Sequence, residues 1–370
     1  MQPPEMTSLP PLIAHLKARI SREGPLSVAD VMSEALLHPE HGYYTNREPF
    51  GAAGDFTTAP EISQMFGELI GLWAAVVWQQ MGAPRTLRLI ELGPGRGTLM
   101  SDALRAAKQL PGFLAATQIH LVEASPRLRA LQQQTLNGHN VSWHERLEEV
   151  PDGPTLLICN EFFDALPIHQ LVRKGQSWCE RRVGLSEPGD ELAWTDTAVP
   201  STQAELVEPR LAGLAKEGDI VEVSPASLDV ATTIAERLQA FGGAALVIDY
   251  GHLESGLGDT LQAVLRHEFA DILSTLGEAD LTAHVDFSAL ARTVVASGAR
   301  VQGAATQGAF LRSLGIEARA AKLMAGATSN QRSQVESALK RLIADEEMGT
   351  LFKVMAWSDS RMADLPGFER

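Results

Sequence analysis

The segment that decides the fold is Leu89-Ile90-Glu91-Leu92-Gly93-Pro94-Gly95-Arg96-Gly97-Thr98. An apolar run precedes the glycines, and a helix-like segment, Leu99–Gln109, follows them. This order predicts a strand, a tight turn and a helix, with the turn where open α/β sheets bind ligands. Glycine permits such a turn and lets the backbone approach a ligand closely. We therefore predict a ligand-binding loop built on Gly93, Gly95 and Gly97.

Similar apolar runs recur on both sides of this loop. The five runs predicted to be strands are Thr86–Leu92, Gln118–Val122, Val141–His144, Thr155–Asn160 and Ala244–Asp249. Several of them lack strict alternation, and helix-like segments separate them, which is typical of a parallel sheet covered on both faces. The sequence therefore predicts an α/β fold with a doubly wound core.

The spacing of the runs indicates an insertion. Eighty-three residues separate Asn160 from Ala244, far more than one crossover needs. The predicted regions are 1–82 (helical and contributing to the site, with one long helix from Pro60 to Gly82), 83–165 (first half of the core), 166–219 (insertion with hairpins), 220–258 (core continuation), 259–286 (irregular lid segment) and 287–370 (C-terminal part of the core).

Composition excludes several classes of protein. The net charge is −15, from 46 acidic and 31 basic residues, which disfavours nucleic-acid binding and favours cationic partners. The two cysteines, Cys159 and Cys179, cannot form a disulfide framework or a C-x-x-C metal site, and Cys159 is predicted to be buried. No signal or transit pattern opens the chain, and the longest apolar stretch has ten residues. We therefore predict a cytoplasmic protein that does not insert into membranes.

The glycine loop discriminates between cofactors. A dinucleotide fingerprint requires glycine at position 98, where this chain has Thr98. Glu91 instead stands two residues before Gly93, a spacing that resembles the first motif of class I S-adenosylmethionine (SAM) methyltransferases. The ammonium and sulfonium groups of SAM suit nearby carboxylates. The loop thus favours SAM over NAD, with a ligand-free turn as the third alternative.

Acidic residues end two of the other predicted strands. Glu123 follows the second strand, where a carboxylate can accept hydrogen bonds from a ribose diol, or can simply face solvent. The fourth strand ends in Asn160-Glu161-Phe162-Phe163-Asp164. Carboxylates with neighbouring rings can hold a flat cation such as guanidinium. Alternatively, Asp164 caps a helix and the two phenylalanines belong to the core.

A second polar constellation is Asp280-x-x-x-His284-x-Asp286. As metal ligands these residues would suit a divalent ion, but they can equally bind substrate or brace a loop, and we predict no metal. Asp286 has the pattern of a helix N-cap. His284 is a candidate general base because its ordinary pKa lies near neutrality.

The chain resembles the MidA-type SAM-dependent methyltransferases, a family that includes mitochondrial complex I assembly factor 7 and bacterial relatives. The similarity extends over nearly the whole chain. The segments that carry it are Pro39-Glu40-His41-Gly42-Tyr43-Tyr44, Gly54-Asp55-Phe56-Thr57-Thr58-Ala59-Pro60-Glu61-Ile62-Ser63-Gln64, Glu91–Met100, Asn160–Pro167, Ile248-Asp249-Tyr250-Gly251, Asp280–Phe287 and Met348–Val354.

The resemblance implies a Rossmann-like class I SAM methyltransferase sheet with a helical N-terminal region and an inserted lid. It also implies protein arginine methylation, giving symmetric dimethylarginine on a core subunit of respiratory complex I or a bacterial equivalent. The expected catalytic residues are Glu161, Asp164, Glu61 and His284. The expected cofactor contacts are Glu91, Gly93, Gly95, Gly97, Glu123, Asn160, Asp55 and Thr58. The segment Thr260–His267 departs from the family pattern, which puts substrate contacts there in question.

Two other functions stay open at this stage. One is a SAM methyltransferase for a small molecule, and the other is a SAM-binding assembly chaperone without catalysis. For the oligomeric state, a homodimer is one option.

Overall fold

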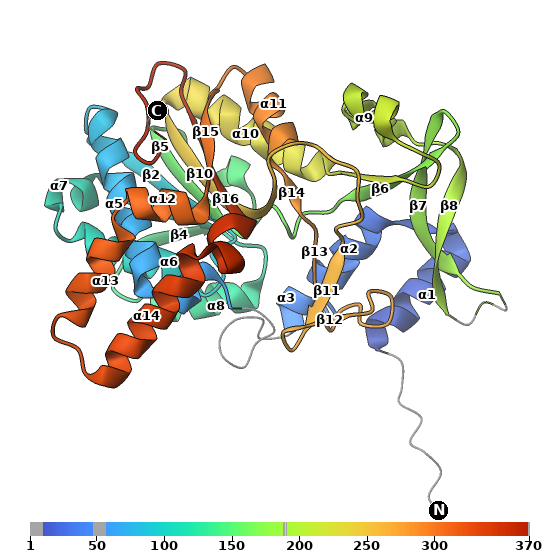
Figure 1. The fold of residues 1–370 in the computed structure, drawn as a ribbon, viewed down its shortest axis with the longest axis horizontal. Coiled ribbons are helices and arrows are strands. Elements are labelled where there is room, and N and C mark those ends of the chain that lie inside the picture. Colours follow the sequence, from blue (N-terminus) through green and yellow to red (C-terminus); the bar gives the residue numbers. More distant parts are fainter. Residues whose placement is uncertain (1–9, 47–56, 188, 190, 369–370) are drawn as a thin grey trace, which may run out of the picture.

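The computed structural model describes residues 10–46, 57–187, 189 and 191–368, and a central sheet organises the larger part of them (Figure 1). Its strands follow the order β15-β16-β10-β5-β2-β3-β4, and β14 pairs with the end of β10. Their bounds are β2 (Leu87–Leu92), β3 (Thr117–Val122), β4 (Val141–His144), β5 (Thr155–Asn160), β10 (Gly243–His252), β14 (Val285–Asp286), β15 (Arg300–Thr306) and β16 (Phe352–Ser358).

The five strands predicted from the sequence are confirmed and are parallel to one another. Strand β16 runs antiparallel to both β10 and β15. Strand β2 pairs with β3 on one side and with β5 on the other, so the strand order reverses between β2 and β5. In an open α/β sheet a ligand binds at the carboxyl ends of the strands beside such a reversal. The predicted α/β fold is therefore confirmed, and it locates the site.

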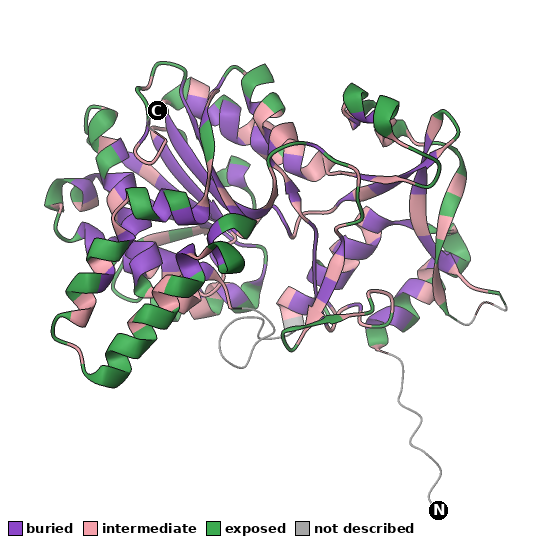
Figure 2. Cartoon of the chain, in the orientation of Figure 1, coloured by how far each residue is buried: buried purple, intermediate pink, exposed green. Residues whose placement is uncertain are grey.

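Side chains alternate between two apolar layers. Figure 2 shows that the strands of the central sheet are mostly buried. Leu156 and Ile158 of β5 pack on one face of the sheet, whereas Leu157 and Cys159 pack on the other, and all four are fully buried. The first layer is covered by α5 (Gln64–Gln80), α6 (Thr98–Ala107), α7 (Pro111–Ala116), α12 (Gln307–Ser313), α13 (Ile316–Met324) and α14 (Ser329–Ile343). The second is covered by α10 (Pro225–Phe241) and α11 (Phe287–Ala296). This burial on both faces explains the continuous apolar runs.

Two smaller sheets lie beside the core with the N-terminal helices (Figure 1). The first has the order β1-β7-β6-β9, with β8 paired to β7: β1 (Leu26–Ser27), β6 (His169–Lys174), β7 (Ser177–Leu185), β8 (Leu192–Pro200) and β9 (Ile220–Val223). The second has the order β12-β11-β13: β11 (Gln262–Leu265), β12 (Glu268–Ala270) and β13 (Asp280–Thr282). The accompanying helices are α1 (Pro11–Glu23), α2 (Val28–Leu37), α3 (Tyr43–Asn46) and α9 (Pro209–Leu214).

The single helix predicted from Pro60 to Gly82 is wrong. The structure has α4 (Ala59–Ile62) and α5, separated by Ser63 in an extended conformation (φ −162°, ψ 137°). The Ser63 hydroxyl accepts a hydrogen bond from the Met65 amide at 3.2 Å and so begins α5 afresh. Serine competes well for this capping role, which the apolar pattern around it does not reveal.

The prediction of irregular chain over 259–286 is also wrong, because β11, β12 and β13 lie there. These strands have only three or four residues each, too few to show an alternating pattern. Their stability comes from packing on α1 and α2, where Ala263 and Leu281 are buried beside Leu16 and Met32.

The contact between α5 and α6 sets the position of the glycine loop, since α6 begins directly after it. A Cβ atom at Gly71 of α5 would lie 2.5 Å from the Cα and carbonyl oxygen of Ala103 in α6. We expect Gly71→Ala to lower the free energy of unfolding by about 1–3 kcal/mol, measured by urea denaturation. The matched control is Gly213→Ala in α9, where the new methyl group meets nothing within 4 Å and should add up to about 1 kcal/mol. Equal effects of the two substitutions would contradict this account.

Candidate functional site

The glycine loop lies at the carboxyl end of β2. Gly93, Gly95 and Gly97 have φ angles of 60°, 52° and 81°, a region that side chains with a Cβ rarely adopt. Steric crowding adds to this requirement at Gly93, where a Cβ would lie 2.9 Å from the Phe162 ring. Backbone conformation thus explains all three glycines, and the turn opens directly into α6.

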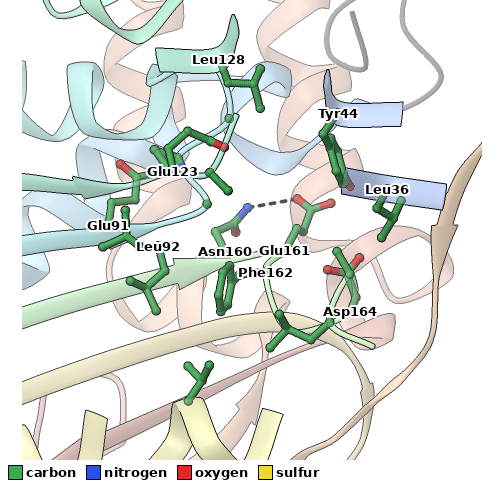
Figure 3. A pocket seen from close by; sticks show the side chains of 18 of the residues that line it. Leu36, Tyr44, Glu91, Leu92, Glu123, Leu128, Asn160, Glu161, Phe162 and Asp164 are labelled. Carbon is green, nitrogen blue, oxygen red and sulfur yellow. Dashed lines mark hydrogen bonds between the residues drawn. The ribbon is translucent and has the colours of Figure 1, made fainter. Parts of the chain in front are cut away.

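A cavity of about 460 Å³ lies against this loop, at the carboxyl ends of β2, β3 and β5 (Figure 3). The side chains and loop atoms around it come from segments that lie far apart in the sequence. Its lining includes Leu36, Leu37, Tyr44, Thr58, Glu61, Glu91, Gly93, Gly95, Glu123, Glu145, Asn160, Glu161, Phe162, Asp164 and Asp280. A volume of this size suits a ligand of roughly drug size.

Gln132 of α8 (Pro126–Thr135) makes hydrogen bonds that connect the residues at one end of the cavity. Its Nε2 donates to the Gly95 carbonyl at 2.8 Å and to Glu123 Oε2 at 3.2 Å. Its Oε1 accepts from the Trp143 indole at 3.0 Å, so this fully buried side chain is satisfied on both ends. Sequence reasoning missed Gln132, because it is the first of three consecutive glutamines and no pattern selects among them.

Glu123 is oriented by these contacts and by the Ser125 amide, which donates to Glu123 Oε1 at 2.8 Å. Burial raises the pKa of Glu123 to about 6. The carboxylate is therefore mostly ionised at neutral pH, and it lines the cavity one residue beyond β3.

Two buried oxygen atoms beside the loop have no hydrogen-bond donor among the described residues: Glu91 Oε2 and Asn160 Oδ1. Glu91 is 3% exposed, and burial raises its pKa to about 8. An unsatisfied buried acceptor is costly unless a ligand or water donates to it. These acceptors fit the amino and hydroxyl donors of SAM, so the residues present match the cofactor that the loop predicts.

A group of carboxylates lies beyond the end of β5. Glu161 adopts a left-handed backbone conformation (φ 51°), rare for a residue with a side chain. Its Oε1 accepts from the Ala59 amide at 3.2 Å and from Asn160 Nδ2 at 3.1 Å (Figure 3). Asp164 is 6% exposed and does not cap a helix, and its Oδ1 meets no donor in hydrogen-bonding geometry among the described residues.

The pKa values of these carboxyl groups rise together. Burial raises the pKa of Glu161 to about 7. Burial and the negative charge of Glu161 raise the pKa of Asp164 to about 7, although the nearby Tyr250 hydroxyl opposes this shift. Acids whose pKa values are shifted into the neutral range, and which face a cavity, are candidates for a functional site.

Asp280 of β13 joins this group from the small sheet. It is 6% exposed, lines the cavity, and accepts a hydrogen bond from the Tyr44 hydroxyl at 2.9 Å. The sequence singled out Asp280 only together with His284 and Asp286. The structure separates these residues, because His284 and Asp286 line a second, smaller cavity and Asp286 caps α11 as predicted.

Of the other predicted site residues, some lie at the cavity and others do not. Glu61 lies over the glycine loop, where the Thr98 hydroxyl donates to it and Arg96 Nη1 is 3.9 Å away. Thr58 lines the cavity, whereas Asp55 lies outside the described residues. His284 does not line the cavity; its ring packs edge-on against Tyr250, and burial lowers its pKa. The geometry therefore gives no support to His284 as the general base.

Residues 69–305 match the model of a family described as S-adenosyl-L-methionine-dependent methyltransferases. The chain belongs to this methyltransferase family. It is 38% identical over 370 residues to protein arginine methyltransferase NDUFAF7, mitochondrial, from Danio rerio, covering 92% of this chain and 85% of that protein. The human protein of the same name is 35% identical, with 95% and 84% covered.

A solved structure supports the same conclusion for this methyltransferase. The crystal structure of a methyltransferase candidate from Burkholderia thailandensis, bound to S-adenosyl-homocysteine, is 30% identical to it with a TM-score of 0.85. The similarity covers 97% of this chain and 94% of that one. The predicted family, fold, enzyme class and SAM cofactor are thus confirmed.

The prediction of a cytoplasmic protein is wrong by the same comparison, since these NDUFAF7 relatives are mitochondrial by name. Within the described part of this methyltransferase, no helix has the length and apolar character needed to cross a membrane.

Gly95→Val tests whether the glycine loop binds the cofactor. A branched side chain here opposes the left-handed backbone and occupies space beside the cavity, so we expect SAM binding measured by calorimetry to be abolished. Gly138→Val is the matched control, because Gly138 also has positive φ (91°) but nothing lies within 4 Å of its Cβ position. It should retain full affinity, and undiminished binding by Gly95→Val would show that the loop is not the cofactor site.

Proposed function

We propose that this methyltransferase is a protein arginine N-methyltransferase. Its proposed acceptor is an arginine in a subunit of respiratory complex I or its bacterial equivalent, with symmetric dimethylarginine as the product. The names of the NDUFAF7 relatives support arginine as the acceptor. The family resemblance supports the respiratory partner and the product.

The observation that carries the proposal is the chemistry at the end of β5. Asp164 Oδ1 is buried beside the cavity and meets no donor in hydrogen-bonding geometry within the described ranges, and Glu161 and Asp280 bring two further carboxyl groups to the same lining. A group of buried carboxylates is stable in ionised form only when cations or donors satisfy it. Guanidinium offers five N–H donors in one plane and holds its charge at any physiological pH.

In this reaction the protein must activate a guanidinium nitrogen, which is a poor nucleophile. The pKa of guanidinium is about 13.8, so the group is protonated at neutral pH, and the lone pairs of its nitrogens are delocalised over the cation. Glu161 and Asp164 would bind the guanidinium, localise its positive charge away from the attacking nitrogen and hold that nitrogen in line for attack. SAM, when bound, supplies the electrophilic methyl group. A carboxylate with a pKa near 7 can also accept the proton that the methylated nitrogen releases.

The proposal is tested by incubating the purified protein with isotope-labelled SAM and an extract of cells that lack it. Label on an arginine of a complex I subunit, located by mass spectrometry, is the expected result. Label only in the small-molecule fraction would favour a metabolite methyltransferase. SAM binding without transfer to any component would favour the assembly chaperone and would overturn the proposal.

Glu161→Gln separates catalysis from cofactor binding. The amide keeps the size of the side chain but loses the charge that holds guanidinium, so we expect kcat to fall by at least about 100-fold. SAM affinity by calorimetry should change less than about threefold, because the glycine loop and Glu123 lie elsewhere in the cavity. Glu336→Gln, which alters an exposed carboxylate on α14 outside the lining of the cavity, is the control and should leave kcat unchanged. Full activity of Glu161→Gln would exclude the proposed role.

The raised pKa values predict a pH dependence with a definite sign. Glu161 and Asp164 have pKa values of about 7, so both carry their proton below that pH and cannot pair with guanidinium. Since kcat/KM reports the free enzyme, its value for an arginine peptide should rise about tenfold or more between pH 6 and pH 8. A flat profile over this interval would contradict the assignment of either carboxylate to the acceptor.

A further inference from the structure

The small three-stranded sheet β12-β11-β13 extends towards the surface from the end of the cavity that is lined by Glu161, Asp164 and Asp280. Asp280 of β13 stands directly opposite Val264 of β11, and Val264 stands directly opposite Phe269 of β12. Residues opposite each other in antiparallel pairs share one face of the sheet. The face that brings Asp280 to the cavity therefore carries Phe269 at its far edge.

The other face of this sheet is already occupied. It carries Leu281, Ala263 and Ala270, which alternate along the strands with Asp280, Val264 and Phe269. These three side chains pack into the apolar cluster of α1 and α2. Phe269 takes no part in that cluster and is 81% exposed, the highest exposure among the large apolar side chains described. The burial of the face that carries Leu281, Ala263 and Ala270 accounts for the sheet's stability, so Phe269 is not needed for folding.

Strand β12 is also an edge. Within the described ranges it pairs only with β11, which leaves the backbone groups on its outer side without a strand partner. Such an edge can accept an extended polypeptide as an additional strand, with backbone hydrogen bonds giving affinity and side-chain contacts giving selectivity.

The dimensions fit a polypeptide whose arginine occupies the cavity. Neighbouring strands are about 4.8 Å apart, so β12 lies about 10 Å from β13 and Asp280. A segment that leaves the β12 edge and crosses this face towards Asp280 in extended form advances about 3.3 Å per residue, so about three residues cover this distance. Leu37 of α2, which is 50% exposed, adds an apolar contact at the cavity itself.

We propose that the acceptor polypeptide binds in extended form along β12, with an apolar side chain two to four residues from the target arginine packed on Phe269. This inference rests on the proposed arginine methyltransferase function, since it is the arginine in the cavity that fixes the position of the chain. It assigns the small sheet a role in selecting polypeptide substrates.

The test uses fluorescein-labelled peptides of 13 residues with one central arginine and glycine or serine elsewhere. In a series of variants, a single leucine replaces the residue at one of the positions −4 to −1 or +1 to +4, and the central arginine is kept. Binding to the full-length protein is measured by fluorescence anisotropy with saturating S-adenosyl-homocysteine. We expect leucine at two to four residues on one side of the arginine to strengthen binding about fivefold or more.

Phe269→Ala should abolish this gain. The control variant is Leu214→Ala, because Leu214 is also exposed (59%) but lies on α9, away from the small sheet. It should retain the gain in full, and calorimetry should give all three proteins the same affinity for S-adenosyl-homocysteine.

A peptide with citrulline in place of arginine distinguishes a failure of the docking inference from a failure of the proposed function. If arginine is required but leucine gives no gain, or the gain survives Phe269→Ala, the docking inference is overturned and the proposed function stands. If citrulline binds as well as arginine, both are overturned. A requirement for arginine, with a leucine gain that only Phe269→Ala removes, supports both.

Discussion

The site depends on Asp249, the buried carboxyl group at which β10 meets the end of β5. Its Oδ2 accepts hydrogen bonds from three successive amides, those of Phe162, Phe163 and Asp164, at 3.2, 3.0 and 3.3 Å. Its Oδ1 accepts from the Tyr250 amide at 2.9 Å. These bonds turn the chain sharply after β5 and stabilise the left-handed conformation of Glu161, so that Glu161 and Asp164 both line the cavity.

This arrangement concentrates negative charge where water is scarce. Burial, together with the charges of Asp164 and Glu161, raises the pKa of Asp249 well above its ordinary range. A bound cation would favour the ionised forms of these groups and release protons. A site of this kind favours cationic ligands, because a cation offsets the repulsion among the ionised carboxylates.

The sequence was sufficient to predict the core and the cofactor loop, for identifiable physical reasons. Burial on both faces produces long apolar runs, and positive φ angles require glycine at positions 93, 95 and 97, so both features appear directly in the residue types. Gln132 could not be found in this way, and Asp280 was singled out only with His284 and Asp286, not with Glu161 and Asp164. Their importance arises from contacts between distant segments, such as Asp280 with Tyr44 and Gln132 with Gly95, which leave no local pattern.

His284, a predicted general base, lies outside the cavity, and the path of the backbone explains why. A histidine between two aspartates has the composition of a catalytic or metal site, yet the chain turns after β13, and the His284 amide is held by the Thr260 hydroxyl at 2.9 Å. That bond fixes the backbone on the side of the smaller cavity. Residue type and spacing indicate which chemistry is available, but only the path of the backbone determines which residues face one cavity.

The N-terminal region aligns the two ends of the cavity. Tyr44 donates to Asp280 at the acceptor end, while its carbonyl accepts from the Ser125 hydroxyl, whose residue also donates its amide to Glu123 at the cofactor end. A continuous chain of hydrogen bonds therefore connects the residue proposed to hold the ribose with a carboxylate proposed to face the guanidinium. The parallel sheet alone could bind the cofactor. It is the residues outside the sheet that set the distance between donor and acceptor, and an in-line transfer requires that distance to be fixed.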